Sequence, residues 1–214
     1  MPAFNHGEAS GFTLLELLVA MALFSLIGLS VLTLSSSVLH DMGTESRMVS
    51  ESMELSRALG LLSSELRMSS SLSPYLPGTN SALYKCSGTV LISSYTVKFF
   101  VVEEDPTALL TSGIKAYYVG YRYDPINKTL LRGEIALNSI YSCTVPATDP
   151  TSSTYAKTLA THVTAIDTNG DGIAETAFAK SGNMLSVNLG VQVNGAGGIS
   201  KLQKLQTKVF ERIS

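Results

Sequence analysis

An acidic segment in the last quarter of the chain has the side-chain spacing of a calcium-binding loop. Asp167, Asn169, Asp171 and Glu175 place oxygen-bearing side chains at loop positions one, three, five and nine. The backbone carbonyl of Ile173 would supply position seven, and Ca²⁺ takes six to eight such oxygens. An EF-hand needs a glutamate at position twelve, where this sequence has a phenylalanine. The spacing therefore predicts a Ca²⁺-binding β-loop, and the alternative is an acidic turn without an ion.

The two cysteines are the second candidate for chemistry. Cys86 and Cys143 are the only thiols in the sequence, too few for a four-cysteine zinc site. Outside the cytoplasm the oxidising environment would favour a disulfide between them. In the chain-entropy model that bond would stabilise the fold by about 4 kcal/mol. The alternative is two buried free thiols.

The three histidines form no catalytic set. His6 and His40 flank the N-terminal apolar region, and His162 stands alone. An active site needs a nucleophile, a base and a charge-stabilising group, and none of these roles is filled around His162. We therefore predict no enzyme activity; a membrane-anchored hydrolase or oxidoreductase is the less favoured alternative.

One long apolar run near the N-terminus contains a single acid. Residues 12–34 read FTLLELLVAMALFSLIGLSVLTL, in which Glu16 is the only charge. A helix of this length spans the roughly 30 Å hydrocarbon core of a bilayer. A carboxylate within such a span costs a few kcal/mol and usually marks a function. The run predicts a membrane-spanning helix, either with a functional glutamate or as an ordinary signal anchor.

The start of this run resembles a known processing signal. The sequence SGFTLLE at 10–16, followed by an apolar helix, is similar to the type III signal of type IV prepilins and pseudopilins. The resemblance implies that a prepilin peptidase cuts after Gly11 and methylates the new amine of Phe12. It also implies that Glu16 pairs with the Phe12 amine of a neighbouring subunit, because an unpaired carboxylate is costly at low dielectric.

The helix is expected to continue with an amphipathic second half. Residues 42–68 contain no proline and carry apolar side chains at helical spacing. The apolar stripe consists of Met48, Leu55, Leu59, Leu62 and Leu66. The charged side chains are expected mostly off the stripe; they are Arg47, Glu51, Glu54, Arg57 and Glu65. Since the residue before a proline avoids the helical region, Ser73-Pro74 should end a helix of roughly 55–60 residues.

The remainder of the chain has the composition of β structure. Val, Ile, Tyr and Phe are frequent in the expected strands, which are 89–93, 95–102, 114–123, 129–136, 161–166, 176–180 and 184–193. DPINK at 124–128 predicts a turn, so 114–136 should form a hairpin. Residues 204–212 fit a strand or a helix, and DPTSSTY at 149–155 is expected to be a polar surface loop.

These elements predict an α+β fold in which a long N-terminal helix packs on an antiparallel β-sheet head, as in pilins. The expected divisions are a leader peptide at 1–11, a transmembrane and filament-core helix at 12–39, an amphipathic helix half at 40–73 and a β-rich head at 74–214. The partners implied by the resemblance are other pilins or pseudopilins, the peptidase and the inner membrane.

Short resemblances indicate the subtype. Residues 56–67 are similar to the helix end of PilW-type minor pilins and J-type pseudopilins, and 121–132 and 207–212 resemble the hairpin and closing strand of these groups. We predict a minor pilin for filament assembly or its initiation, with adhesion or DNA uptake as further roles. It would sit in the bacterial inner membrane with its head outside the cytoplasm before joining the pilus. The alternative is a J-type subunit of the periplasmic pseudopilus of type II secretion.

Basic residues in the tail suggest one further partner. Lys201, Lys204, Lys208 and Arg212 form a stripe that could contact DNA phosphates. The favoured interpretation is a solvated edge strand, because lysines at sheet edges prevent unwanted pairing. The formal charge of −2 also argues against a protein built wholly for nucleic acid.

Overall fold

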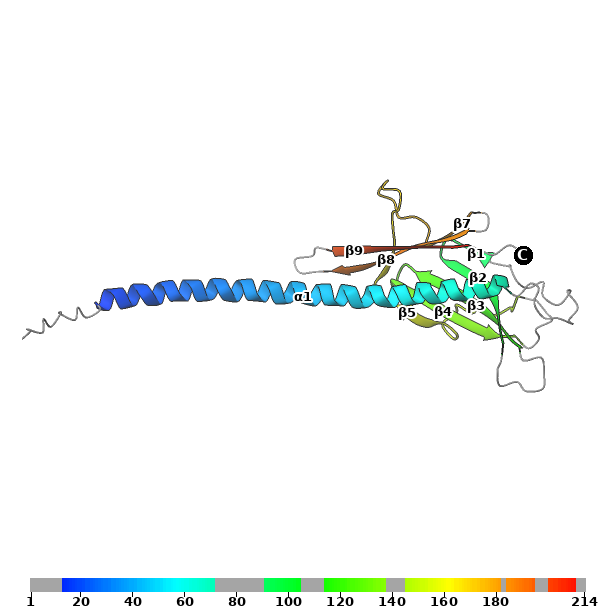
Figure 1. Cartoon of the computed structure of the whole chain (residues 1–214), viewed down its shortest axis with the longest axis horizontal. Coiled ribbons are helices and arrows are strands. Elements are labelled where there is room, and N and C mark those ends of the chain that lie inside the picture. Colours follow the sequence, from blue (N-terminus) through cyan, green and yellow to red (C-terminus); the bar gives the residue numbers. More distant parts are fainter. Residues whose placement is uncertain are drawn as a thin grey trace, which may run out of the picture. The chain divides into compact units, whose positions relative to one another are not determined.

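The computed structural model describes residues 13–71, 91–104, 114–137, 145–181, 184–194 and 200–210. The described part contains one helix, α1 (Leu14–Ser71), followed by strands in the rest of the chain (Figure 1). The strands are β1 (Leu91–Ile92), β2 (Thr96–Glu104), β3 (Ile114–Asp124), β4 (Thr129–Ala136), β5 (Lys157–Ala160), β6 (Val163–Ala165), β7 (Phe178–Ser181), β8 (Met184–Asn194) and β9 (Ser200–Phe210). The α+β prediction is confirmed.

Helix α1 is 58 residues long, as the absence of proline and the helical spacing predicted. The predicted stop at Ser73-Pro74 lies outside the described residues. The chain nevertheless divides into two compact units, and the boundary falls within the helix between Gly43 and Thr44. In the described residues the first unit contains only the first part of α1 and Thr13 before it, whereas the second contains the rest of α1 and all described strands.

The first sheet of the second unit has the strand order β1-β2-β3-β4-β5, and every neighbouring pair is antiparallel. The predicted hairpin is present, because β3 and β4 pair from Asp124↔Thr129 to Tyr117↔Ala136. At its turn the carboxylate of Asp124 accepts N–H bonds from Ile126 (3.0 Å) and Asn127 (3.1 Å). A side chain that bonds the backbone two and three residues on favours such a turn.

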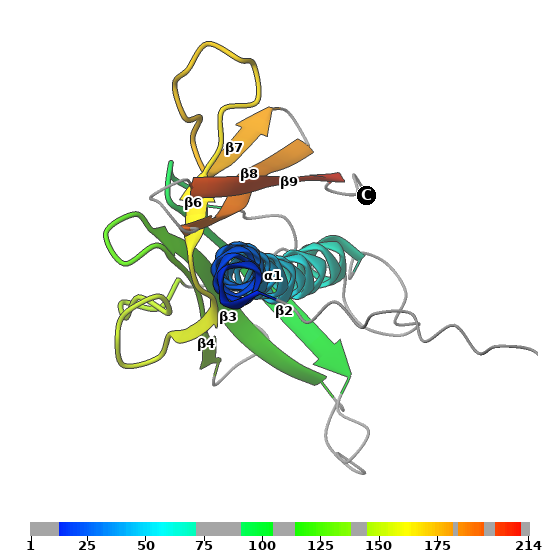
Figure 2. The ribbon, with the colours of Figure 1, turned by 90° about the vertical axis from the view of Figure 1, so that its left-hand side faces the viewer.

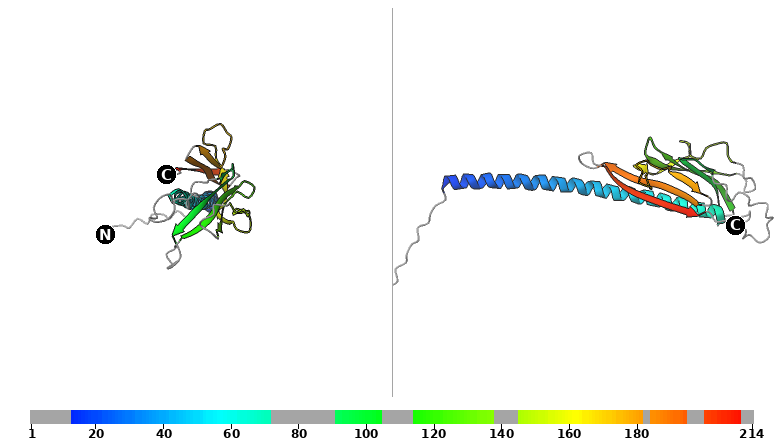
Figure 3. Two further views of the ribbon diagram at one scale, coloured as in Figure 1. Left: turned by 90° about the vertical axis from the view of Figure 1, so that its right-hand side faces the viewer. Right: turned by 90° about the horizontal axis from the view of Figure 1, so that it is seen from above.

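The second sheet is built around β8. Strand β9 pairs along the whole length of β8, while β6 and β7 share its other edge. The tail at 204–212, for which strand and helix remained open, is therefore strand up to Phe210. Figure 3 shows β8 and β9, in orange and red, beside the second half of the helix.

The hydrophobic core of the second unit lies between the helix and the inner faces of both sheets (Figure 2). The predicted stripe is confirmed, since Leu55, Leu59, Leu62 and Leu66 are all buried and Met48 packs beside them. The predicted face of β8 is confirmed too; Leu185, Val187, Leu189, Val191 and Val193 are buried.

The expectation of a polar surface loop at 149–155 is wrong for Pro150 and Thr151, which are buried against the outer face of β3 and β4. Gly120 and Gly133 face each other across this hairpin and leave room for that contact. A Cβ at Gly133 would meet the carbonyl oxygen of Pro150 at 1.7 Å. The loop then leads into β5, a strand that the sequence analysis missed.

Candidate functional site

The start of α1 is a capping box formed by Thr13 and Glu16. Glu16 Oε2 accepts hydrogen bonds from the backbone N–H and the hydroxyl of Thr13, both at 3.0 Å. In return Thr13 Oγ1 accepts the backbone N–H of Glu16 at 3.3 Å. This reciprocal pattern satisfies donors that a helix leaves open in its first turn. Gly11 and Phe12, the predicted cleavage and methylation residues, lie outside the described residues.

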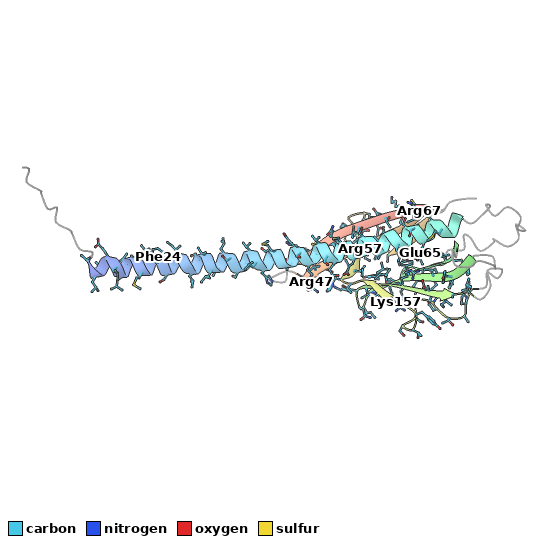
Figure 4. The ribbon with its side chains drawn as sticks, turned by 60° about the horizontal axis from the view of Figure 1, so that its bottom comes forward. Phe24, Arg47, Arg57, Glu65, Arg67 and Lys157 are labelled. Carbon is cyan, nitrogen blue, oxygen red and sulfur yellow. The ribbon has the colours of Figure 1, made fainter. Side chains whose placement is uncertain are left out.

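The rest of the first unit presents apolar side chains on all sides. Phe24 is 79% exposed and Leu29 is 69% exposed (Figure 4). The hydroxyls of Ser25 and Ser30 donate to carbonyls one turn back, Met21 O at 2.8 Å and Leu26 O at 2.9 Å. In the described part, α1 is the one helix long and apolar enough to cross a membrane, judged by length and composition. Its self-satisfied polar groups suit that environment.

Glu65 is an exception to the expectation that the charges lie mostly off the buried stripe, since it is only 4% exposed. Tyr121 Oη donates to Glu65 Oε2 at 2.5 Å. Arg132 donates from Nη2 to Glu65 Oε1 at 2.5 Å and from Nε to both carboxylate oxygens. Tyr121 and Arg132 are direct cross-strand partners in β3 and β4. Figure 4 shows Glu65 near the end of α1, on the side of these strands.

Burial and the neighbouring charge determine the protonation of this cluster. Burial of the Tyr121 phenol and then the negative charge of Glu65 raise the pKa of Tyr121 well above its usual range. The phenol therefore stays neutral and remains a hydrogen-bond donor. Arg132 also pairs with Glu134 at the surface, with an Nη1–Oε2 distance of 2.7 Å. The cluster joins the helix to two strands by charge-assisted bonds.

A second acid of the helix, Glu51, contacts the turn between β5 and β6. Its Oε2 accepts the hydroxyl of Thr161 at 2.7 Å, and its Oε1 lies 3.0 Å from Nδ1 of His162. Arg47 Nη2 lies 2.9 Å from Nε2 of His162. Because a guanidinium can only donate, Nε2 of His162 accepts this hydrogen bond. Nδ1 of His162 then carries the ring proton and donates toward Glu51. His162 adopts a left-handed backbone conformation with φ of 56°, which is uncommon outside glycine.

The predicted calcium loop closes on itself. Asp167 accepts three backbone N–H bonds, from Asn169 at 3.1 Å, Gly170 at 2.6 Å and Gly172 at 2.8 Å. The bonds from Gly170 and then Gly172 lower the pKa of Asp167. Asp171 in turn accepts the N–H of Ile173 at 2.8 Å.

A carboxylate oxygen has more than one lone pair, so these hydrogen bonds orient the acids without excluding a cation. Lys204 Nζ also donates to the carbonyl of Asp167 at 2.6 Å, which brings a positive charge to the loop. Among the residues that the structure describes, no three His, Cys, Asp or Glu side chains are grouped as a metal site. Glu175 is held through its backbone N–H, which donates to Ile166 O at 3.1 Å. Calcium binding stays a prediction.

The basic tail residues do not share one face of β9. Lys201 points to the helix and pairs with Glu45 at 3.1 Å, whereas Lys204 bonds the acidic loop on the opposite face. Side chains three residues apart lie on opposite faces of a strand. An extended tail therefore already predicts that Lys201 and Lys204 do not share one face. Lys208 is exposed, and Arg212 lies outside the described residues.

Among the pockets in the described part of the second unit are two shallow ones, neither of which holds a catalytic arrangement. One, of about 380 Å³, includes Lys98, Tyr118 and Asp149; the other, of about 400 Å³, lies between the helix around Arg57 and β5. His162 is engaged by Glu51 and Arg47, as described above. Cys86 and Cys143 lie outside the described residues, so the disulfide stays a prediction.

Residues 8–32 match the family model described as the prokaryotic N-terminal methylation motif. The match spans the candidate cleavage residue Gly11, the candidate methylation residue Phe12 and the capping acid Glu16. It ends within the apolar part of α1. No curated protein and no solved structure matches the chain.

Proposed function

Because the chain carries the signal of type IV prepilins and pseudopilins, we propose that it is a minor pilin of a type IV pilus. The methylation motif indicates a structural subunit rather than an enzyme, processed by prepilin peptidase and assembled with other pilins. Its apolar helix fits anchoring in the inner membrane followed by incorporation into a filament. The observation that carries the proposal is that the matched signal at residues 8–32 runs directly into the long apolar helix α1.

Processing would expose the residues that assembly requires. Cleavage after Gly11 leaves Phe12 with a methylated, cationic amine directly before the Thr13–Glu16 cap. Both cap bonds fall on Glu16 Oε2. Pairing of Oε1 with the Phe12 amine of a neighbour would therefore leave the cap intact, and it would offset the cost of a carboxylate in the filament core.

The second unit supports a subunit whose head folds around its own helix. Its core joins α1 to both sheets, so the head does not depend on a neighbour for its apolar face. We propose that this head lies outside the cytoplasm and acts in filament assembly or its initiation. Adhesion would be a further role. We give β9 no DNA-binding role, because Lys201 and Lys204 bond within the chain.

A minor pseudopilin of the J type is the second candidate. Residues 56–67 resemble the helix end of both groups, and Glu65 and the adjacent buried leucines fall in this segment. The same processing is expected for either candidate. The two differ in what the filament does, so deletion of the gene separates them. Loss of surface pili supports the pilus, and loss of protein secretion with normal pili supports the pseudopilin.

The first test is mass spectrometry of the subunit from membranes and from sheared surface filaments. We expect a chain that begins with methylated Phe12. Gly11→Val should block cleavage, because a Cβ at this position hinders entry of the extended leader into the peptidase. Gly28→Ala is the matched control, since nothing lies within 4 Å of that helical glycine. A mature chain that begins at Met1 contradicts the proposal.

A further inference from the structure

The buried face of α1 in the second unit repeats every seven residues. Three columns of side chains form it: Met48, Leu55 and Leu62; Ser52, Leu59 and Leu66; and Glu51, Ala58 and Glu65. A face with this repeat can meet its partner again after the helix slides by seven residues, about 10 Å along its axis. Something other than the repeat must therefore select one axial position.

The first two columns discriminate between positions only at their ends. A slide of seven residues exchanges Leu62 for Leu55, or Leu66 for Leu59, at the same place in the core. These exchanges keep the same side chain at a buried site. At the end of the columns Met48 would replace Leu55, an exchange that cores tolerate well, but Ser52 would replace Leu59, and the opposite slide would require leucines at 69 and 73, where the sequence has serines.

The third column does discriminate, because it alternates acid, alanine and acid. The partners of Glu65 stand on the first sheet: Tyr121 in β3 and Arg132 in β4 contact its carboxylate. A slide by one heptad that moves the N-terminal part of the helix toward the sheets would bring Ala58, in place of Glu65, opposite the guanidinium. The Tyr121 hydroxyl would then lose its buried acceptor and Arg132 would keep only its surface partner Glu134, and both losses are unfavourable in a core.

We propose that Glu65, held by Arg132 and Tyr121, is a register key that sets the axial position of α1 against the two sheets. Glu51 with Thr161 and His162 reinforces it two heptads away. Buried polar groups fix register in this way in coiled coils, at some cost in stability. For a pilin, and so resting on the proposed function, the key would fix how many helical residues separate Glu16 from the head.

Distance measurement between the helix and a strand tests the key. The full chain in detergent micelles carries nitroxides on non-natural residues at Arg57 and Lys157, which are exposed and leave the native cysteines untouched (Figure 4). A second pair uses Arg57 and Lys208. Pulsed electron resonance then gives the distance distribution. We expect one narrow distance per pair in the unmodified chain.

Two variants separate a key from ordinary packing. Glu65→Leu/Tyr121→Phe/Arg132→Met removes the whole polar cluster and leaves no orphaned charge in the core, so it should fold but gain a second distance from the helix displaced by about 10 Å. Ala58→Glu/Glu65→Ala moves the acid by one heptad. It should shift the main population to that displaced position.

The control and the contrary result are equally specific. Glu134→Gln removes the surface partner of Arg132 and should leave both distances unchanged. A triple variant that keeps the single distances of the unmodified chain would overturn the proposal, because packing alone would then set the register. If the heptad-shifted variant does not fold, the triple variant decides. Neither result depends on filament formation, so failure of the pilin proposal would be seen separately.

Discussion

The two halves of α1 satisfy their polar groups in opposite ways. Glu16 bonds the backbone and hydroxyl of Thr13, three residues before it. Glu65 bonds Tyr121 and Arg132, which lie in strands far along the chain. The first half hides no apolar side chain, whereas the second buries a full stripe. The first half of the helix therefore satisfies its capping acid within its own first turn. The second half needs the strands of the head to cover its stripe and to pair its acid.

The difference shows which surroundings each half can tolerate. Hydroxyls that donate to carbonyls one turn back, as those of Ser25 and Ser30 do, can enter lipid or a bundle of similar helices without orphaned donors. A helix that buries an ionised glutamate needs a cation and a hydrogen-bond donor on the element that covers it. Similar substitutions in the two halves should therefore have unequal effects on the stability of the head.

The largest effect is expected from truncation of a buried leucine. Leu62 has no exposed surface, and Leu62→Ala should lower the free energy of unfolding of the head by about 2–5 kcal/mol. Leu29→Ala makes the same chemical change where the side chain is 69% exposed and should leave the head transition unmoved. Denaturant titration in micelles, followed by tyrosine fluorescence, measures both. Equal shifts would mean that the head also depends on the first half.

A slightly smaller effect is expected at the buried acid. Glu65→Ala leaves Arg132 and the Tyr121 hydroxyl without their acceptor, and because the Arg132 side chain keeps 20% exposure we expect a loss of about 2–4 kcal/mol. Glu134→Gln breaks the other ion pair of Arg132, where the Glu134 side chain is 51% exposed, and should cost less than about 1 kcal/mol. A loss at Glu65 as small as at Glu134 would contradict a partnered buried charge.

A third acid, Asp167, already accepts hydrogen bonds from its own loop. It tests whether a bound Ca²⁺ ion stabilises such a loop further. If Ca²⁺ binds residues 167–175, ten times its Kd should add about 1.4 kcal/mol and raise the Tm of the head by a few degrees. Asp171→Ala should melt at one temperature with calcium or chelator. A wild-type melting curve that calcium does not move would show that the bonds from Gly170 and Gly172 suffice.

The smallest effect is expected at the cap. Thr13→Val removes the hydroxyl and should cost about 1 kcal/mol, confined to the first turn of α1. Amide hydrogen exchange of residues 14–17 in micelles should accelerate while the head stays protected. Thr33→Val is the control, because its hydroxyl bonds Ser30 O inside the helix and caps nothing. Acceleration that spreads into the head would mean that the two halves unfold together.

The periodic spacing of apolar residues predicted the architecture, but it does not reveal which distant residues contact one another. The leucine stripe and the face of β8 followed from spacings of three to four and of two, and both are buried as expected. The signal at the N-terminus was predictable because its glycine, apolar residue and acid stand at fixed positions, and the family comparison bears this out. The cap was missed although Thr13 and Glu16 have the spacing of a capping box.

Glu65 was missed because helical spacing alone cannot tell a flanking charge from a buried one. A signal existed in the strand: Arg132 follows Leu130 by two residues, so it shares the inward face. Strand β5 was missed because its four residues do not alternate clearly and exist as a strand through pairing with β4. The burial of Thr151 depends on two facing glycines, a coincidence that no local pattern records.

The place of β9 in the core has a consequence for synthesis of the chain. Val209 packs in the same cluster as Leu55 and Leu62, and β9 supplies one edge of the second sheet. At about 5–20 residues per second, the ribosome needs on the order of ten seconds to reach β9 after the helix has been made. The part of the core that β9 closes stays uncovered during that interval, although the strands of the first sheet are made earlier, so nascent subunits should depend on a holding chaperone.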